Sequence, residues 1–217
     1  MLGQFIFELD AYDNFKSEDY FVSPSNIDAV NLINLFPNWH NNGIVIIGGE
    51  KSGKTHLGHI WKEKSNANFF DFKKNTNLNK IDAKKNNIFD NFQLIKEENE
   101  KDFFQIYNNI INNNYYIVFL TSSDLPVQLK LNDLKSRFES LTKVSISPPD
   151  DQLIQAMLLK FFHDNQINIA PDVVSFIVSR VSRDYKEIHL FLDKINQLSL
   201  EHKSKISIPF LNKFFTF

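Results

Sequence analysis

A glycine-rich loop with fixed spacing is the feature that most restricts how this chain can fold. The stretch GGEKSGKTH, residues 48–56, fits the pattern G-x-x-x-x-G-K-[ST] through Gly48, Gly53, Lys54 and Thr55. The continuous apolar run GIVIIG comes directly before the loop, and a helix is predicted after it. This order of strand, loop and helix is the setting in which the pattern binds phosphate. The sequence therefore predicts a P-loop within an α/β fold.

The chemistry of phosphate binding gives each part of this loop a role. Glycines let the backbone N–H groups point inward, and the helix N-terminus adds a partial positive charge. Lys54 is expected to reach the β- and γ-phosphates, and the Thr55 hydroxyl to bind Mg²⁺. The expected nucleotide contacts around the loop are Gly48, Gly49, Glu50, Lys51, Ser52, Gly53, Lys54, Thr55 and His56. The expected ligand is ADP or ATP with Mg²⁺.

Short apolar runs predict a five-stranded sheet. They cover residues 43–48, 67–72, 86–90, 115–123 and 143–147. The first of them, GIVIIG, is a continuous apolar run bounded by glycine, which is typical of a strand buried on both faces of a parallel sheet. Segments with helical spacing alternate with these runs. The expected fold class is therefore α/β, a parallel five-stranded sheet flanked by helices.

The pattern changes at Pro148-Pro149. Helices are predicted beyond this point, over about 150–163, 171–182 and 184–200, with a short terminal element at 208–216. Pro171 suits the first turn of the second of these helices. The expected organisation is an N-terminal tail (1–17), a nucleotide-binding α/β domain (18–147) and a small all-helical lid domain (148–217).

An acidic residue is expected opposite the P-loop. P-loop proteins usually hold Mg²⁺ through an aspartate at the end of another buried strand. Asp90, which closes the run NNIFD, is the candidate, so Thr55 and Asp90 are the predicted Mg²⁺ ligands. Efficient ATPases of this design carry a second acid next, but here that position is Asn91, and an amide cannot act as a general base. The sequence therefore predicts nucleotide binding with weak or no autonomous hydrolysis.

Composition excludes several classes of protein. The 217 residues have a net charge of −2, so a strongly basic nucleic-acid coat is excluded. No apolar run approaches a membrane span, no signal peptide is recognisable, and cysteine is absent, which makes the cytoplasm the expected location. Only three of the 24 basic residues are arginine, which makes each arginine informative. One of them, Arg137, lies in a polar segment outside any apolar stripe.

These segments together resemble the AAA+ ATPases of the DnaA group, and more closely the Hda-type regulatory inactivators of DnaA in alphaproteobacteria. The resemblance covers nearly the whole chain. The matching segments are EDYFVSPSNIDAV (18–30), GGEKSGKTHLGHIW (48–61), IFDN (88–91), FLTSSD (119–124), DLKSRF (133–138) and SRDYKEIHLFLDKI (182–195). In that group they correspond, in order, to a segment beside the adenine, the Walker A loop, the Walker B strand, sensor 1, the arginine-finger segment and the sensor 2 helix.

The resemblance implies roles for individual residues. Val22 would lie beside the base, Ser123 would take the sensor 1 position, and Asn91 is what Hda-type proteins show after the Walker B aspartate. Arg137 would be an arginine finger, donated in trans to the nucleotide of a neighbouring DnaA. Lys186 stands where the group usually has the sensor 2 arginine, so the charge is kept but the bidentate fork is lost.

The N-terminal tail resembles a short glutamine-led motif with which Hda proteins bind the DNA polymerase III sliding clamp, its β subunit. The expected clamp-binding residues are Gln4, Phe5, Phe7 and Leu9. An extended peptide would place the glutamine in a polar notch and the two outer apolar side chains in pockets. The alternative is an N-terminal strand that packs on the protein itself.

The expected function is negative regulation of chromosomal replication initiation. The chain would bind nucleotide, dock on the clamp and promote hydrolysis of ATP bound to the initiator DnaA through Arg137; a homodimer is also possible. No sequence-specific DNA contact and no membrane contact are expected, because no basic recognition helix follows the lid and the length fits a tail, an AAA+ domain and a lid. The alternatives are another protein of the DnaA group, such as an initiator or a helicase loader, and a P-loop kinase or ATPase acting on a small molecule.

Overall fold

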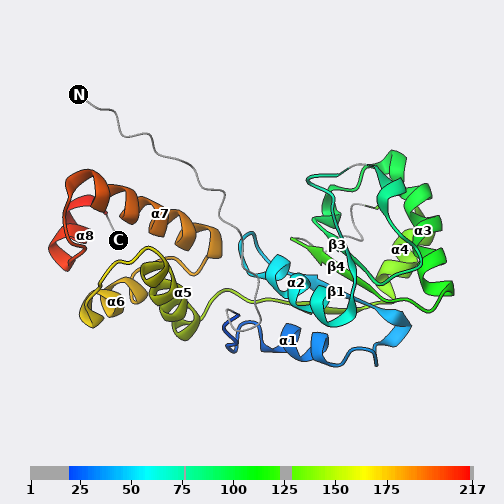
Figure 1. Cartoon of the computed structure of the whole chain (residues 1–217), viewed down its shortest axis with the longest axis horizontal. Helices are drawn as coiled ribbons and strands as arrows, with labels where there is room; N and C mark the ends of the chain where they lie inside the picture. The colour runs from blue at the N-terminus through cyan, green and yellow to red at the C-terminus, as the bar shows by residue number, and fades with distance from the viewer. Residues whose placement is uncertain (1–19, 76, 123–128, 216–217) are drawn as a thin grey trace.

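A parallel five-stranded sheet forms the centre of the larger part of the molecule (Figure 1). The structure is a computed structural model that describes residues 20–75, 77–122 and 129–215. The strands are β1 (Gly43–Ile47), β2 (Asn68–Asp71), β3 (Asn87–Asp90), β4 (Ile117–Thr121) and β5 (Thr142–Ser145). Their order across the sheet is β2-β3-β4-β1-β5. Each strand lies within or next to one of the five apolar runs, so the predicted sheet is confirmed.

The register of the sheet brings the polar ends of neighbouring strands together. All pairs are parallel, with β1 between β4 and β5, and with β3 between β2 and β4. Asp71, the last residue of β2, is the partner of Asp90, the last residue of β3. Because the carboxyl ends of parallel strands share one edge, these residues and the loop after β1 lie on the same side of the sheet.

Helices cover both faces of the sheet (Figure 1). They are α1 (Ile27–Asn34), α2 (Lys54–Ser65), α3 (Glu100–Asn112) and α4 (Asn132–Glu139). Alternate strand residues point to opposite faces, so Phe119 packs with Phe103 and Phe138 under α3 and α4, whereas Leu120 packs with Leu57 and Trp61 under α2. Short 3₁₀ helices lie at His40–Asn42, Leu78–Lys80, Phe92–Leu94 and Glu97–Asn99.

Helix α4 was not predicted as a helix from the sequence. Its eight residues are mostly polar, and only Leu134 and Phe138 are buried. These two residues are four positions apart, so a single narrow stripe holds the helix against α3 and the sheet. This helix carries Arg137 in its last turn.

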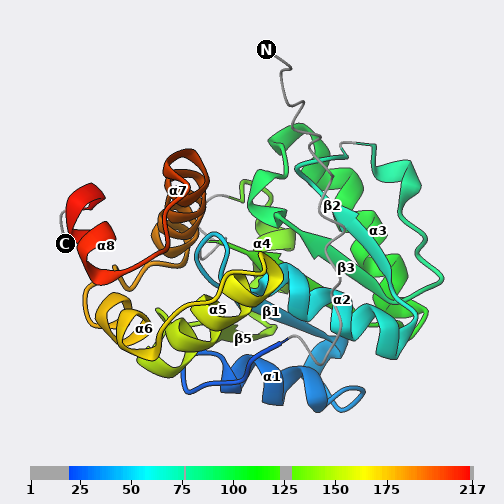
Figure 2. The same cartoon turned by 60° about the vertical axis from the view of Figure 1, so that its left-hand side comes forward.

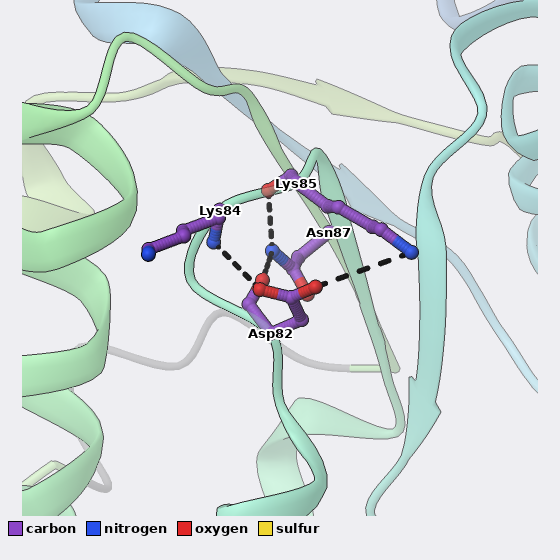
Figure 3. Close-up of polar contacts among 4 residues, drawn as sticks. All are labelled: Asp82, Lys84, Lys85 and Asn87. Atoms are coloured by element: carbon purple, nitrogen blue, oxygen red, sulfur yellow. Dashed lines mark hydrogen bonds and ion pairs between the residues drawn. The ribbon is translucent and has the colours of Figure 1, made fainter.

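Polar contacts fix the start of β3 (Figure 3). Asn87 is buried, and its side-chain amide donates hydrogen bonds to the backbone carbonyls of Asp82 (3.0 Å) and Lys85 (2.7 Å). The Lys84 N–H donates to the Asp82 carboxylate at 2.9 Å, and the Lys85 ammonium lies 4.0 Å from the same carboxylate. Since β3 is short, anchoring its first residue also fixes the position of Asp90 at its end.

The C-terminal part is a bundle of helices with a core of its own (Figure 2). Its helices are α5 (Asp151–Asp164), α6 (Pro171–Val178), α7 (Tyr185–His202) and α8 (Ile208–Phe214). Helix α6 ends at Val178, before the predicted end at about residue 182. Helix α7 begins where predicted, because the Asp184 carboxylate accepts a hydrogen bond from the Glu187 N–H and caps the first turn. Within the described ranges, no helix is both long and apolar enough to cross a lipid bilayer.

Candidate nucleotide-binding site

The predicted P-loop connects β1 to α2 with the backbone that such a loop requires. Helix α2 begins at Lys54, directly after Gly53, whose φ of 88° is in the left-handed region that favours glycine. A Cβ atom on Gly53 would lie 3.1 Å from a ring carbon of Tyr20, so the tyrosine ring covers this turn. Tyr20 also meets the His56 ring edge to face, with the centroids 5.2 Å apart. The loop is therefore shaped by its own glycine and supported from the N-terminal side.

The Lys54 ammonium lies inside the loop. It donates hydrogen bonds to the carbonyl oxygens of Gly48 and Gly49, each at 2.7 Å, and approaches the Ser52 hydroxyl at 3.4 Å. Burial lowers the pKa of Lys54, although the Asp90 carboxylate opposes that shift. A partly buried cation whose hydrogen-bond partners are neutral groups is a strong receptor for an anion such as phosphate.

Thr55 and Asp90 are brought together as the sequence predicted. The Thr55 hydroxyl donates to Asp90 Oδ2 at 2.8 Å, and the Asn91 N–H donates to Oδ1 at 2.8 Å. The Asp90 residue is only 3% exposed, and burial raises the pKa of its carboxyl. A hydroxyl beside a carboxylate is a set of oxygen donors that suits Mg²⁺. Elsewhere in the described part of the chain, no group of three His, Cys, Asp or Glu residues could hold a metal.

A cavity of about 710 Å³ opens between the P-loop and the lid. Its wall on the sheet side includes Tyr20, Phe21, Val22, Lys51, Ser52, Gly53 and His56. Its wall on the lid side includes Leu153, Met157, Phe161, Tyr185, His189 and Leu192. The volume and the mixture of apolar walls with a few polar groups are typical of a small-molecule site. Val22, which was predicted to lie beside the base, is thus on the wall of this cavity.

Lys186 meets the P-loop from the lid. Its ammonium lies 3.0 Å from Glu50 Oε2, and both side chains are more than half exposed. The hydrogen bond with Glu50 raises the pKa of Lys186 and lowers the pKa of Glu50. The predicted sensor 2 position therefore stands at the rim of the loop, paired with an acid of the loop itself.

Among the cavity-wall residues that sequence reasoning missed are two with ionisable side chains, His189 and Tyr20. His189 lies one turn after Lys186 on α7, and burial, together with the nearby Lys51 ammonium, lowers the pKa of its imidazole. Tyr20 lies in the segment 18–30 that resembles the DnaA group, but no role was predicted for it. Its hydroxyl is buried, and this burial raises the pKa of Tyr20. Neither position carries a motif, because each meets the cavity only through tertiary packing.

Arg137 lies away from this cavity, exposed on the last turn of α4. The segment before α4 is held by Glu100, a buried carboxylate that accepts hydrogen bonds from the backbone N–H groups of Lys130 and Leu131 at 2.6–3.1 Å. No ion pair to the Arg137 guanidinium is made by any described residue. An exposed guanidinium that makes no ion pair within the described part of the chain, on a firmly attached helix, is able to contact a neighbouring molecule. Glu100 carried no signal in the sequence beyond its place in an acidic first turn.

The remaining predicted site residues lie outside the described residues. They are Ser123 and the tail residues Gln4, Phe5, Phe7 and Leu9.

Comparisons with known proteins agree with this geometry. Residues 150–215 match the family model described as "Hda, lid domain". The chromosomal replication initiator protein DnaA of Buchnera aphidicola subsp. Cinara cedri is 26% identical over 197 residues, which cover 79% of this chain and 45% of that protein. The chain thus spans less than half the length of this curated relative.

Two solved structures show the same fold. Domain III of the Thermotoga maritima replication initiation protein DnaA has a TM-score of 0.73 at 17% identity, over 93% of this chain and 97% of that one. AMPPCP-bound DnaA from Aquifex aeolicus has a TM-score of 0.66 at 20% identity, over 87% and 66% of the two chains.

The P-loop after β1, the acidic end of β3 and the helical lid over the loop define an AAA+ protein. Within this class of protein, the match of the lid to the Hda model and the similarity to DnaA indicate which relatives the chain resembles. The lid is similar to that of Hda, and most of the chain is similar to the initiator DnaA, which agrees with the resemblance seen in the sequence.

Proposed function

We propose that this protein is a nucleotide-binding regulator of replication initiation that acts on DnaA. The observation that carries the proposal is the Thr55–Asp90 pair beside a P-loop, closed over by a lid that matches the Hda family. The Thr55–Asp90 pair and the P-loop support nucleotide binding, and the lid supports a regulatory role in the DnaA system. Such a regulator works in the bacterial cytoplasm, where the chromosome is replicated.

ADP or ATP is the proposed ligand of the cavity. The phosphates would lie on the N–H groups of residues 48–56 and on Lys54, and the base would lie against Val22 and the apolar wall of the lid. Thr55 and Asp90 would hold Mg²⁺ through their oxygens. A DnaA of the same fold is known in a complex with AMPPCP, which supports this class of ligand.

Arg137 is the proposed finger that promotes hydrolysis of ATP bound to DnaA. Its position on α4, away from the protein's own cavity and without an ion pair to any described residue, suits donation to a neighbouring subunit. Gln4, Phe5, Phe7 and Leu9 are the proposed tether to the sliding clamp. Assembly with DnaA rather than base-specific DNA contact would then determine where the protein acts, and a homodimer would be a resting form.

A reconstituted assay tests this function. Hydrolysis of ATP bound to DnaA is measured with and without clamp-loaded DNA, using the intact protein and its Arg137→Ala and Lys135→Ala variants. The intact protein and Lys135→Ala, a matched loss of charge on the same helix, should stimulate hydrolysis. Arg137→Ala should keep nucleotide and clamp binding but lose about 10³-fold or more of the stimulation. Stimulation that persists in Arg137→Ala would reject the finger.

A further inference from the structure

The carboxyl edge of the sheet holds a carboxylate–amide pair beside Asp90. The side-chain amide of Asn91 donates a hydrogen bond from Nδ2 to Asp71 Oδ1 at 2.8 Å. Asp71 ends β2, and the sheet register places it directly opposite Asp90. The two residues are 20 positions apart in sequence but adjacent at the edge where the P-loop also lies.

Both partners of the pair are held in place. The Lys73 N–H also donates to Asp71 Oδ1 at 2.8 Å, which fixes the carboxylate at the strand end. The Asn91 N–H donates to Asp90 Oδ1, and the Asn91 backbone is in the left-handed region, with φ of 54°, which asparagine tolerates better than most residues. The Asn91 side chain is therefore anchored at its backbone by Asp90 and at its Nδ2 by Asp71.

This arrangement determines which way the amide is turned. An ionised carboxylate can only accept hydrogen bonds, so Nδ2 must face Asp71 and the carbonyl oxygen Oδ1 must face away from it. No described residue donates to that Oδ1 atom. The carboxylate also polarises the amide, which makes Oδ1 a better acceptor.

We propose that Asp71 orients the Asn91 amide so that its Oδ1 accepts a hydrogen bond from the water that attacks the terminal phosphate of a bound nucleoside triphosphate. The inference rests on the proposed function, in which that nucleotide occupies the P-loop. It gives the chain a slow hydrolytic activity of its own, although the position after Asp90 carries no acid. Asn91 positions the water, and Asp71 acts through Asn91 as a positioning residue.

The reaction needs no strong base. The water oxygen forms a bond to the γ-phosphorus, the bond from that phosphorus to the bridging oxygen breaks, and its electron pair remains on the nucleoside diphosphate. The proton lost by the water passes to an oxygen of the phosphate product. In P-loop GTPases a glutamine amide orients the water in this way, and the intrinsic rates are about 10⁻⁴ to 10⁻² s⁻¹. The expected rate for this chain lies in that range.

Single-turnover hydrolysis of bound ATP by the isolated protein tests the pair. Lys54→Ala gives the background, and Asp102→Ala, which removes an exposed acid on α3, is the matched control. Asp71→Ala and Asn91→Ala should each lower the rate by about ten-fold, the effect of losing a supporting hydrogen bond in a site. The double variant should be no slower than the slower single variant, because the two residues act as one unit. Affinity for ATP and ADP should stay within about two-fold of that of the intact protein.

Exchanging the two groups gives a test that a merely structural role would not pass. Asn91→Asp alone sets two carboxylates face to face, and their repulsion should lower the melting temperature below that of the intact protein. The exchange Asp71→Asn with Asn91→Asp restores one amide and one carboxylate. It should recover the melting temperature and hydrolyse ATP at least as fast as the intact protein.

A readout independent of turnover follows the amide itself. The side-chain NH₂ signal of Asn91, identified by its loss in Asn91→Ala, should shift in Asp71→Ala and should stay in place in Asp102→Ala. The inference is overturned if ATP binds but is not hydrolysed above the Lys54→Ala background, if Asp71→Ala keeps the full rate, or if the two losses are additive. Failure of the intact protein to bind ATP or ADP would instead reject the proposed function.

Discussion

Asp90 shows how a functional residue is held at a cost to the fold. Its carboxyl is almost fully buried, and burial raises its pKa despite hydrogen bonds from Thr55 and Asn91 and the nearby Lys54 ammonium. The neighbouring Asp71 carboxylate raises that pKa further. A raised pKa in the folded chain means that the ionised form is less favourable there than in the unfolded chain. The residue that is expected to hold Mg²⁺ is therefore one whose neutral form the surrounding protein favours.

Asp90→Asn should separate stability from function. The amide resembles the neutral acid, so the variant should unfold at a higher urea concentration than the intact protein at pH 7, where the intact carboxyl is ionised. In the intact protein, stability is lost as pH rises through the unfolded pKa of about 4 towards the higher folded value. The advantage of the variant should therefore vanish below about pH 4. Mg²⁺-dependent nucleotide affinity, measured by calorimetry, should fall at least about ten-fold. A variant that is less stable than the intact protein at pH 7 would contradict the argument, and Asp102→Asn is the exposed control.

Among the helices and strands, the sequence predicts those that bury a continuous stripe. All five strands were found, and the clearest signals were the uninterrupted apolar runs of β1 and β4, which are buried on both faces of the sheet. Helix α4 was missed because two apolar side chains in eight residues give a weak period. The P-loop and Asp90 were predicted because their order along the chain reflects their order in the site.

The rest of the site depends on contacts between distant segments. Asp71 orients a side chain only because Asn91, 20 positions away in sequence, lies beside it. Glu100 likewise anchors a segment only because the N–H groups of residues 130 and 131 lie beside its carboxylate. A polar residue at the end of an apolar run, the signal that identified Asp90, is also present at Asp71. The sequence could not say which strands would be neighbours, and therefore could not pair these two ends.

Glu100 should control the helix that carries Arg137. Glu100→Gln turns an amide NH₂ group towards backbone N–H donors that now share two carboxylate oxygens, so one or more of these donors would lose its partner. The expected loss of unfolding free energy is about 1–3 kcal/mol, measured by urea denaturation. Hydrogen exchange should increase at the start of α4 but not in α2. Unchanged exchange in α4 would show that this carboxylate does not anchor the helix. Glu97→Gln, an exposed change in the 3₁₀ turn before α3, is the control.

Asp150 links the lid to the sheet domain through the first turn of α5. Its carboxylate accepts from the Leu153 N–H at 2.9 Å, which caps the helix, and from the Ser25 N–H at 3.3 Å, which comes from the segment before α1. Burial, the largest single influence, raises the pKa of Asp150, but the hydrogen bonds from Leu153, Ser23 and Ser25 together outweigh it and hold the pKa below its usual range. The group therefore stabilises the fold above the unfolded pKa, and this contribution is lost as pH falls through the folded value.

Asp150→Ala should cost about 1 kcal/mol of unfolding free energy at pH 7, the usual value of a helix cap, and less at low pH, where the intact carboxyl is protonated. Asp184→Ala removes the cap of α7, which lies within the lid, and serves as the matched control. Only Asp150→Ala should also weaken the attachment of the lid, seen as faster proteolysis between residues 145 and 150. Equal proteolysis of the two variants would show that the Ser25 contact contributes nothing.

The molecule as a whole is two packed units joined on both sides of one cavity. On the inner side, the Tyr185 hydroxyl of α7 donates to the Ser147 carbonyl at 3.0 Å, and Tyr185 and Leu153 complete the core beneath α1 and α2. On the outer rim, the contact is the exposed Lys186–Glu50 ion pair. The inner contact is buried and holds the units together, whereas the rim contact lies in solvent and is weak by nature. A nucleotide that binds in the cavity would lie next to the weak Lys186–Glu50 ion pair, because Glu50 belongs to the P-loop.

Glu50→Gln should therefore tighten nucleotide binding. In the intact protein, the Glu50 carboxylate places a negative charge on the loop that receives phosphate and also occupies the Lys186 ammonium. The neutral variant removes the repulsion and leaves Lys186 available to the phosphates, so affinity for ADP and ATP should rise a few-fold at low salt. The gain should shrink as salt approaches 1 M, where exposed charges are screened within about 3 Å. Glu63→Gln, a change of an exposed side chain near the C-terminal end of α2, should leave the affinity unchanged. Weaker binding by Glu50→Gln would instead mean that the glutamate itself contacts the nucleotide. The Lys186→Ala variant, measured alongside, would show whether the Lys186 ammonium of the lid contributes to phosphate binding at all.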